Sequence, residues 1–504
     1  MVTDNSEMLM KALMSKLYKT ITGGEAEGIK IPRNKFVSWL LPGFPMSTID
    51  FSFASDGLVG NTAEETKLRY HKAWALSKLV DFVPDLPPEN NGNNDFIDNA
   101  GGGMGQVVHA TTQDAISEVW NDVLKYSKVV NIEISDKEKE KLENFRQKMV
   151  VTKEVVDLVT DEKKQVTQPS PLTIAYNTKM NDYITAADDY MNLLIDAQAA
   201  KGDSSEAIRR VTAWANKSKF LRDKMDAAYN AWISEGYKNE YEEMNAYINQ
   251  VTERSMVLYK EALKREYENS LMSSPAEAGA GDFRYTSVVP ADFATTPGWT
   301  EFKWYDQDYD AHFDSHTSSW SAKGSVSFGL FSFGGSASHS KTEVNSNFKS
   351  TGFSASLEFT QIPIIRPWFK PGFFWNRGWT LDQLWDMQYD KRVSDGEQRP
   401  QGRLIAYSTS ALFVRNVHFA FAEADAMSHY VDEKTSAGGS VGYGPFSLGG
   451  SYSTGDTSGD NHAHMEGGEL VIKGMQLIGY INNLIPKAPN PNPNIKPEQF
   501  VGGA

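Results

Sequence analysis

The chain has no cysteine among its 504 residues. This absence excludes disulfide bonds, thiolate nucleophiles and cysteine-ligated metal sites. A cysteine-free chain fits a cytoplasmic protein and equally a bacterial export route, so the compartment stays open. The sequence also lacks a long hydrophobic run. No window of about 18 residues is uniformly apolar, so no transmembrane helix is expected.

Positive charge is scarce as well. Lys and Arg number 50 against 65 Asp and Glu, which gives a formal net charge of −15. Nucleic acid selects basic patches, so we do not expect it as a partner. Charge alone would not attract this chain to strongly anionic lipid either. The first residues carry Asp4 and Glu7 and lack a basic start, so no signal peptide is predicted. The protein is therefore expected to be cytoplasmic or released without a classical signal.

What the sequence does contain is an internal repeat. Residues 321–340 and 436–455 agree at 12 of 20 positions when aligned at an offset of 115. In both copies apolar and small polar residues alternate, and the parity flips at a glycine-containing turn. That pattern predicts a β-hairpin with two different faces. The similarity continues into residues 355–362 and 470–477, so each half of the repeat (300–365 and 411–480) reads as strand, Gly/Ser-rich hairpin and strand.

The whole chain is predicted to be α+β: an N-terminal helical bundle followed by an antiparallel β domain with two repeated glycine/serine-rich β-hairpins. Capping boxes at Thr62–Glu65 and Ser135–Glu138, followed by helical apolar stripes, support the bundle. The expected divisions are an extended N-terminal segment (1–61), the helical bundle (62–272), a linker (273–282), the β domain (283–485) with a Trp-rich insert (366–390), and a Pro/Asn-rich tail (486–504).

The Trp-rich insert has two interpretations. Its four tryptophans are interleaved with basic residues, which suits a lipid headgroup layer or a sugar. The same Pro-flanked segment could instead pack as a rigid plug of the core. The candidate headgroup or sugar contacts are Trp368, Trp375, Trp379 and Arg377.

Catalytic and metal-binding signals are weak. No acid, base and nucleophile set appears, so the chain is not expected to be an enzyme and no cofactor is predicted. A G-x-S-x-G match at Gly438–Gly442 lies inside the alternating repeat, without the strand-before, helix-after context of a nucleophile elbow. Alternate residues of a strand can present several ligands to one ion, which makes His462, His464 and Glu466 candidate metal ligands.

The two hairpins carry the main functional prediction. Each arm has close to the 9–11 residues that span a bilayer as a β-strand, with apolar residues on one face and Ser or Gly on the other. Alternatively, the hairpins cover each other's apolar faces, or are exchanged between subunits. The predicted contact residues for lipid or a neighbouring subunit are Phe328, Leu330, Phe331, Phe333, Tyr443, Phe446 and Leu448.

A helical bundle with two amphipathic β-hairpins resembles the general plan of hairpin-inserting pore-forming proteins. The resemblance is one of layout, and no residue role is taken from it. It implies a membrane-active homo-oligomer that inserts both hairpins. The alternatives are a structural homo-oligomeric assembly with hairpins as connectors, and a soluble module that binds carbohydrate or lipid.

Overall fold

The computed structural model describes residues 5–21, 35–86, 104–106, 114–131, 135–156, 163–199, 205–273, 281–305, 330–333, 353–389, 392–397, 399–420, 424–436, 440–449 and 463–502. The chain is α+β with antiparallel sheets, as predicted. It divides into two compact units. The first combines Met1–Val129 with Leu263–Ala504, and the second is Val130–Ala262.

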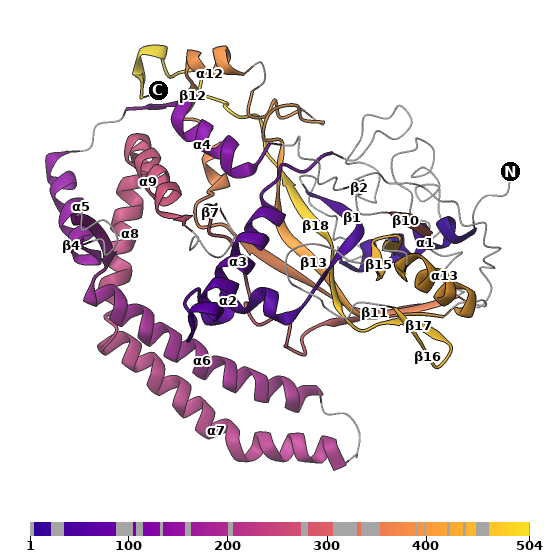
Figure 1. Ribbon diagram of the computed structural model, residues 1–504. Helices are drawn as coiled ribbons and strands as arrows, with labels where there is room; N and C mark the ends of the chain where they lie inside the picture. Colours follow the sequence, from indigo (N-terminus) through magenta and orange to yellow (C-terminus); the bar gives the residue numbers. More distant parts are fainter. Residues whose placement is uncertain are drawn as a thin grey trace. The chain divides into compact units, whose positions relative to one another are not determined.

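A large sheet forms the centre of the first unit (Figure 1). Its main path runs β16-β17-β13-β18-β1-β2, and β11 pairs on the other side of β13 with β8 and β9 beyond it. All of these pairs are antiparallel except β1 with β2. The strands are β1 (Lys35–Met46), β2 (Met104–Gln106), β8 (Ser287–Val288), β9 (Thr300–Trp304), β11 (Ser354–Ile365), β13 (Ala406–Ala420), β16 (His464–Glu466), β17 (Glu469–Ile472) and β18 (Met475–Leu484).

The two faces of this sheet are covered by different helices. Along β13, Leu412 and Val414 belong to a cluster with helix α1 (Asn5–Ile21), whereas Ala411 and Phe413 belong to a cluster with helix α3 (Ala63–Val80). This division follows the period of two along a strand, which sends successive side chains to opposite faces. The sheet is therefore buried on both sides, by α1 on one and by α3 on the other.

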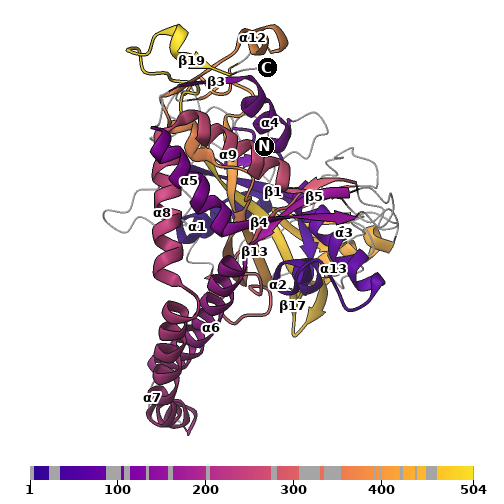
Figure 2. The ribbon, with the colours of Figure 1, turned by 90° about the vertical axis from the view of Figure 1, so that its left-hand side faces the viewer.

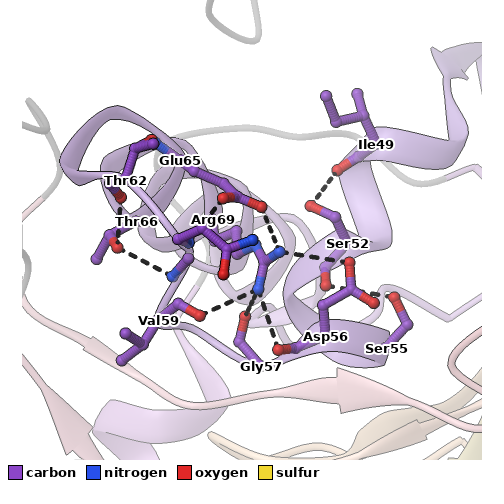
Figure 3. Close-up of polar contacts among 12 residues, drawn as sticks. Ile49, Ser52, Ser55, Asp56, Gly57, Val59, Thr62, Glu65, Thr66 and Arg69 are labelled. Carbon is purple, nitrogen blue, oxygen red and sulfur yellow. Dashed lines mark hydrogen bonds and ion pairs between the residues drawn. The ribbon is translucent and has the colours of Figure 1, made fainter.

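Local signals set the start of α3 (Figure 3). The Thr62 hydroxyl accepts a hydrogen bond from the Glu65 backbone N–H at 3.1 Å, which is the predicted N-cap. Arg69 is buried and ties the preceding loop to the helix. Its guanidinium donates to the carbonyls of Asp56, Gly57 and Val59 and forms ion pairs with Glu65 and Asp56.

The remaining elements of the first unit are short. Two small sheets have the orders β12-β3-β19 and β6-β7, and a third, β10-β14-β15, is described below. The elements are η1 (Thr48–Phe51), α2 (Ser52–Asp56), α4 (Ile116–Tyr126), β3 (Ser127–Val130), β6 (Leu271–Met272), β7 (Phe283–Arg284), η3 (Pro371–Trp375), β12 (Trp379–Leu381), α12 (Gln383–Gln388), α13 (Ala424–Ser436), η4 (Pro497–Gln499) and β19 (Phe500–Val501). Helix α9 (Met256–Asn269) crosses the sequence boundary between the units.

The second unit is mainly helical. Its long helices α6 (Pro171–Ala199) and α7 (Ser205–Ser234) lie side by side, as Figures 1 and 2 show. The other elements are α5 (Asp136–Met149), β4 (Val150–Val156), β5 (Lys163–Pro169) and α8 (Lys238–Arg254). Tyr176 of α6 stacks on Tyr241 of α8 with ring centroids 3.9 Å apart. Several apolar side chains of α6 and α7 are exposed, namely Ile174, Ile184, Ile208 and Val211.

Two predicted divisions need correction. The N-terminal segment 1–61 is not extended throughout, because α1 is a helix of 17 residues whose apolar side packs into the core. The segment 62–272 is not all helical, because β4 and β5 pair as a hairpin from Val150↔Pro169 to Val156↔Lys163. Among the described helices, none is long and apolar enough to cross a membrane.

Candidate functional site

Two long chain segments leave the same end of the main sheet. The first insert, residues 305–353, connects the end of β9 to the start of β11, and Trp304 lies opposite Ala355. The second insert, residues 421–468, connects the end of β13 to the start of β17, and Ala420 lies opposite Glu469. Because Ser354 also lies opposite Ala420, the bases of both inserts are neighbours. The four strands follow the order β9-β11-β13-β17, of which β11, β13 and β17 are labelled in Figure 1.

The bases of the two inserts have identical registers. In the first, Trp304 pairs with Ala355 and Phe302 with Leu357. In the second, Phe419 pairs with Leu470 and Val417 with Ile472. Adding the repeat offset of 115 to each member of a first pair gives the corresponding second pair. The sequence offset therefore coincides with equal backbone pairing at the two bases.

The tip of the second insert is a tight hairpin. Strands β14 (Ser440–Tyr443) and β15 (Phe446–Gly449) pair across a turn at Gly444 and Pro445. Gly444 has φ +56°, a left-handed conformation that glycine adopts without steric cost. Across the turn Tyr443 lies opposite Phe446. Chain stretches of equal length, residues 420–442 and 447–469, separate this pair from the base pair Phe419↔Leu470.

One strand of the first insert joins this hairpin. β10 (Leu330–Phe333) pairs antiparallel with β14, from Leu330↔Tyr443 to Phe333↔Ser440. The two repeat copies thus meet edge to edge, rather than covering each other face to face at these residues. The predicted contact residues Leu330, Phe331 and Phe333 lie on β10, whereas Phe328 lies outside the described residues.

The predicted contact residues of the second copy are buried. Tyr443, Phe446 and Leu448 are 0–1 % exposed and belong to the cluster that contains α1. The rings of Tyr443 and Phe446 lie 5.7 and 5.3 Å from the ring of Phe419, in edge-to-face geometry. In this conformation these side chains contact the chain's own core and not a lipid or a second subunit.

Polar contacts also hold the hairpin to the main sheet. The buried amide of Gln476 on β18 accepts from the Ser447 backbone N–H and donates to the Ser447 carbonyl, both at 2.8 Å. The Gly43 backbone N–H donates to the Pro445 carbonyl at 2.8 Å. On the side of α1, Met10 lies against Gly444. Helix, strand and turn together fix the hairpin in its folded position.

The Trp-rich insert leaves the opposite end of the sheet, since it connects the end of β11 to the start of β13. Trp368 and Trp379 are 1 % and 0 % exposed, so these two residues belong to the core. The prediction that they contact a headgroup or a sugar is therefore wrong for this conformation. Trp375 is 50 % exposed. Arg377 is exposed, with its Nε 3.4 Å from the Asn490 carbonyl.

The predicted metal ligands do not form a site among the described residues, in which no group of three suitable ligands occurs. His464 Nε2 lies 3.4 Å from a Glu466 carboxylate oxygen on β16. Lys473 lies 2.9 Å from the same carboxylate, and its hydrogen bond lowers the pKa of Glu466. His462 lies outside the described residues. The charged partner of Glu466 here is thus a lysine.

Sequence reasoning missed a buried arginine. The Arg366 guanidinium donates to the Ser408 carbonyl and hydroxyl and to the Val80 carbonyl at 2.6–2.8 Å. Burial lowers its pKa to about 10. Burial also raises the pKa of Tyr480, whose hydroxyl donates to the Leu79 carbonyl at 3.1 Å. Arg366 and Tyr480 thus hold the end of α3 against the sheet through hydrogen bonds to the Val80 and Leu79 carbonyls.

Comparison with known proteins gives no match. No family model, no curated protein and no solved structure matches the chain.

Proposed function

We propose that the protein is a membrane-active, pore-forming-like homo-oligomer that extends its two inserts into paired β-hairpins. In this proposal residues 305–353 and 421–468 are equivalent hairpin units, and the helices of residues 130–262 are the bundle that accompanies them. Register carries the proposal. The pairs Phe419↔Leu470 and Tyr443↔Phe446 are joined by arms of equal length, so one continuous hairpin can include both without surplus residues.

The side-chain pattern of the tip supports the same proposal. Continuing the base register places Val441 opposite Leu448 and Ala437 opposite Tyr452, with Ser and Gly on the other face. The folded hairpin departs from this by a one-residue shift beside Val441. About ten residues on each arm are amphipathic in this way, which matches the length of a membrane-spanning strand. The remaining part of each arm is polar and would stay outside the bilayer.

Pairing between the inserts also fits an extended sheet. In the strand order β9-β11-β13-β17, the returning arm of the first insert is the neighbour of the outgoing arm of the second. β10 and β14 belong to those two arms and are already paired antiparallel. In the base register set by Ser354↔Ala420, extension would keep β10 and β14 side by side with a one-residue shift, from Phe331↔Gly442 to Phe331↔Tyr443. It would also break the contacts of the tip with α1, Gln476 and Gly43.

An engineered disulfide tests this proposal. A Cβ atom on Gly444 would lie 2.8 Å from Cγ of Met10, close to where the sulfur of a cysteine at position 10 would lie. The double variant Met10→Cys/Gly444→Cys in the cysteine-free chain should join α1 to the hairpin tip. When oxidised it should not release dye from phosphatidylcholine vesicles, and reduction should restore release. The single variants Met10→Cys and Gly444→Cys are the controls, and their release should not depend on reductant.

Three outcomes would oppose the proposal. Equal dye release by the oxidised and reduced double variant would mean that the hairpin does not leave α1. No release by the natural chain from any vesicle composition would remove the membrane function itself. Release that rises steeply with anionic lipid would contradict binding by a chain of net charge −15.

A structural homo-oligomer is the second candidate, favoured by one observation. The β10–β14 pair joins two distant segments through strand edges, and such pairing can be exchanged between identical chains. Under this alternative, rings, tubes or cages form in plain buffer without vesicles. Electron microscopy of the purified protein with and without vesicles separates the two.

The third alternative is carbohydrate or lipid binding through the Trp-rich insert. Of the contacts predicted for it, Trp375 and Arg377 are exposed.

A further inference from the structure

A cavity of about 460 Å³ lies between the end of β1 and helix α3 in the first unit. Most of its lining is apolar. Several of these side chains pack against the buried cluster of the sheet yet remain only partly buried, because the cavity exposes them. Its size lies in the range of small-molecule sites, which are about 300–1,000 Å³. The apolar lining residues include Phe44, Met46, Trp74, Ala75, Leu76 and Leu79.

The polar lining is unevenly charged. Asp50 is its acidic member, and both carboxylate oxygens have partners: Lys72 Nζ lies 2.8 Å from Oδ1, and the Ser47 backbone N–H donates to Oδ2 at 2.7 Å. Lys72 thus balances the acid. His71 and Lys78 also line the cavity. Lys78 is exposed and makes no ion pair within the described part of the chain. The rim therefore offers a free cation in a chain that is acidic overall.

The walls of the cavity are held in place without a ligand. Arg69 fixes the start of α3 through the contacts shown in Figure 3, one turn before Lys72. The Lys72–Asp50 ion pair then joins α3 to η1, the short helix that follows β1. A site that is already formed loses less conformational freedom on binding.

We propose that this cavity binds a single-chain amphiphile with an anionic head, namely a free long-chain carboxylate. The alkyl chain lies along the apolar lining, where each buried methylene strengthens binding roughly fourfold. The carboxylate stays at the rim and pairs with Lys78. Asp50 does not repel it, since Lys72 neutralises that charge. This binding is separate from the proposed hairpin extension, because none of the lining residues belongs to either insert.

The test uses the full chain without vesicles and three twelve-carbon probes below their micelle concentrations. These are dodecanoate, dodecanol and dodecyltrimethylammonium, followed by calorimetry. Dodecanoate should bind at one site and more tightly than the other two. Lys78→Glu should weaken dodecanoate about tenfold and favour the cationic probe. Lys67→Glu makes the same charge change on the same helix away from the cavity, and should leave dodecanoate binding unchanged.

A second variant tests the cavity itself. Ala75→Phe should fill part of the space and reduce dodecanoate affinity about tenfold or more, with an unchanged circular dichroism spectrum. Unchanged binding in a folded Ala75→Phe variant would overturn the assignment to this cavity. Equal affinity for all three probes, or no saturable binding of dodecanoate, would overturn the anionic amphiphile. The Lys78→Glu result stands even if Ala75→Phe does not fold, because Lys78 is exposed and its replacement leaves the core intact.

Discussion

Met10 of α1 lies so close to Gly444 at the hairpin turn that a Cβ atom on the glycine would come within 2.8 Å of its side chain. Gly444→Ala should therefore destabilise the protein twice over, through its left-handed φ of +56° and through this clash. We expect a loss of about 2–3 kcal/mol in urea unfolding.

Gly467→Ala is the matched control for that substitution. Gly467 has a similar φ of +63° in the turn between β16 and β17, but no atom lies within 4 Å of the added Cβ position. It should lose only about 1 kcal/mol, the strain of the left-handed conformation. Equal losses for the two variants would show that α1 does not press on the hairpin turn in solution.

The Trp-rich insert provides a second pair of variants. Trp379 is fully buried and its ring centroid lies 4.7 Å from that of Phe373, whereas Trp375 is half exposed. Trp379→Ala should cost about 3–5 kcal/mol through the cavity it leaves. Trp375→Ala should cost less than about 1 kcal/mol. Chemical denaturation followed by circular dichroism compares them, and a larger loss for Trp375→Ala would contradict this arrangement of the insert.

Stability at high pH should depend on Tyr480. Burial raises its folded-state pKa above the ordinary value of 10.0, so the stability it contributes is complete below about pH 10 and falls as the pH rises further. At neutral pH, Tyr480→Phe should lower the free energy of unfolding by about 1 kcal/mol, because it removes the hydrogen bond to the Leu79 carbonyl. This deficit should shrink and reverse above pH 10.

The control for this substitution is Tyr237→Phe, since Tyr237 is 47 % exposed. Its effect on the unfolding free energy at neutral pH should stay within about 0.5 kcal/mol. Arg366 acts in the opposite sense to Tyr480. Its pKa is lowered to about 10, so loss of its proton in the folded state favours folding between about pH 10 and its ordinary value of 12.5. The two groups interact electrostatically, so Tyr480→Phe also changes the contribution of Arg366 at high pH. A deficit for Tyr480→Phe that stays constant up to pH 10.5 would contradict the burial of its hydroxyl.

Local features of the fold were readable from the sequence. The caps at Thr62 and Ser135 depend on residues three positions away, and both hydroxyls accept the expected backbone N–H. The reciprocal capping box is formed at Ser135, while the Glu65 carboxylate accepts from the Asn61 backbone N–H. The α+β class with antiparallel strands also follows from periodicity alone. The strands β4 and β5 were missed because Val150–Val156 directly continues helix α5, and no turn signal separates the two.

Long-range partners were not readable. Lys35 of β1 pairs with Asn483 of β18, although the two residues are separated by most of the chain. The local sequence of either strand does not indicate which other strand it pairs with. The same limit applies to the hairpin tip. Alternation showed that Tyr443 and Phe446 share an apolar face, but a pattern on one hairpin does not say that α1 covers it. The cavity beside α3 depends equally on distant segments meeting.

The buried pair Lys72–Asp50 gives a further prediction. Both side chains are largely buried, and the Nζ–Oδ1 distance is 2.8 Å. Lys72→Met should cost about 3–5 kcal/mol, because it leaves a buried carboxylate without its cation. The double variant Asp50→Asn/Lys72→Met should regain much of that loss. Lys219→Met is the control, since Lys219 and Asp223 form an exposed pair whose loss should hardly change the unfolding free energy. Similar losses for Lys72→Met and Lys219→Met would show that the buried pair is accessible to water.

The division into units predicts which fragments fold. Residues 130–262 form a compact unit of their own, so this fragment should be soluble, helical and cooperative in thermal unfolding. The longer fragment 1–275 adds Met1–Val129 without the strands that complete its sheet. β1 would lack β18, its antiparallel partner from Lys35↔Asn483 to Met46↔Met475, and α1 would lose the hairpin it covers. Unpaired strand edges and exposed apolar faces favour aggregation. We therefore expect fragment 1–275 to aggregate while 130–262 remains monomeric in size-exclusion chromatography. If fragment 1–275 were soluble and showed one cooperative transition, the first unit would not need its C-terminal strands, and the division at Val129 and Leu263 would be incorrect.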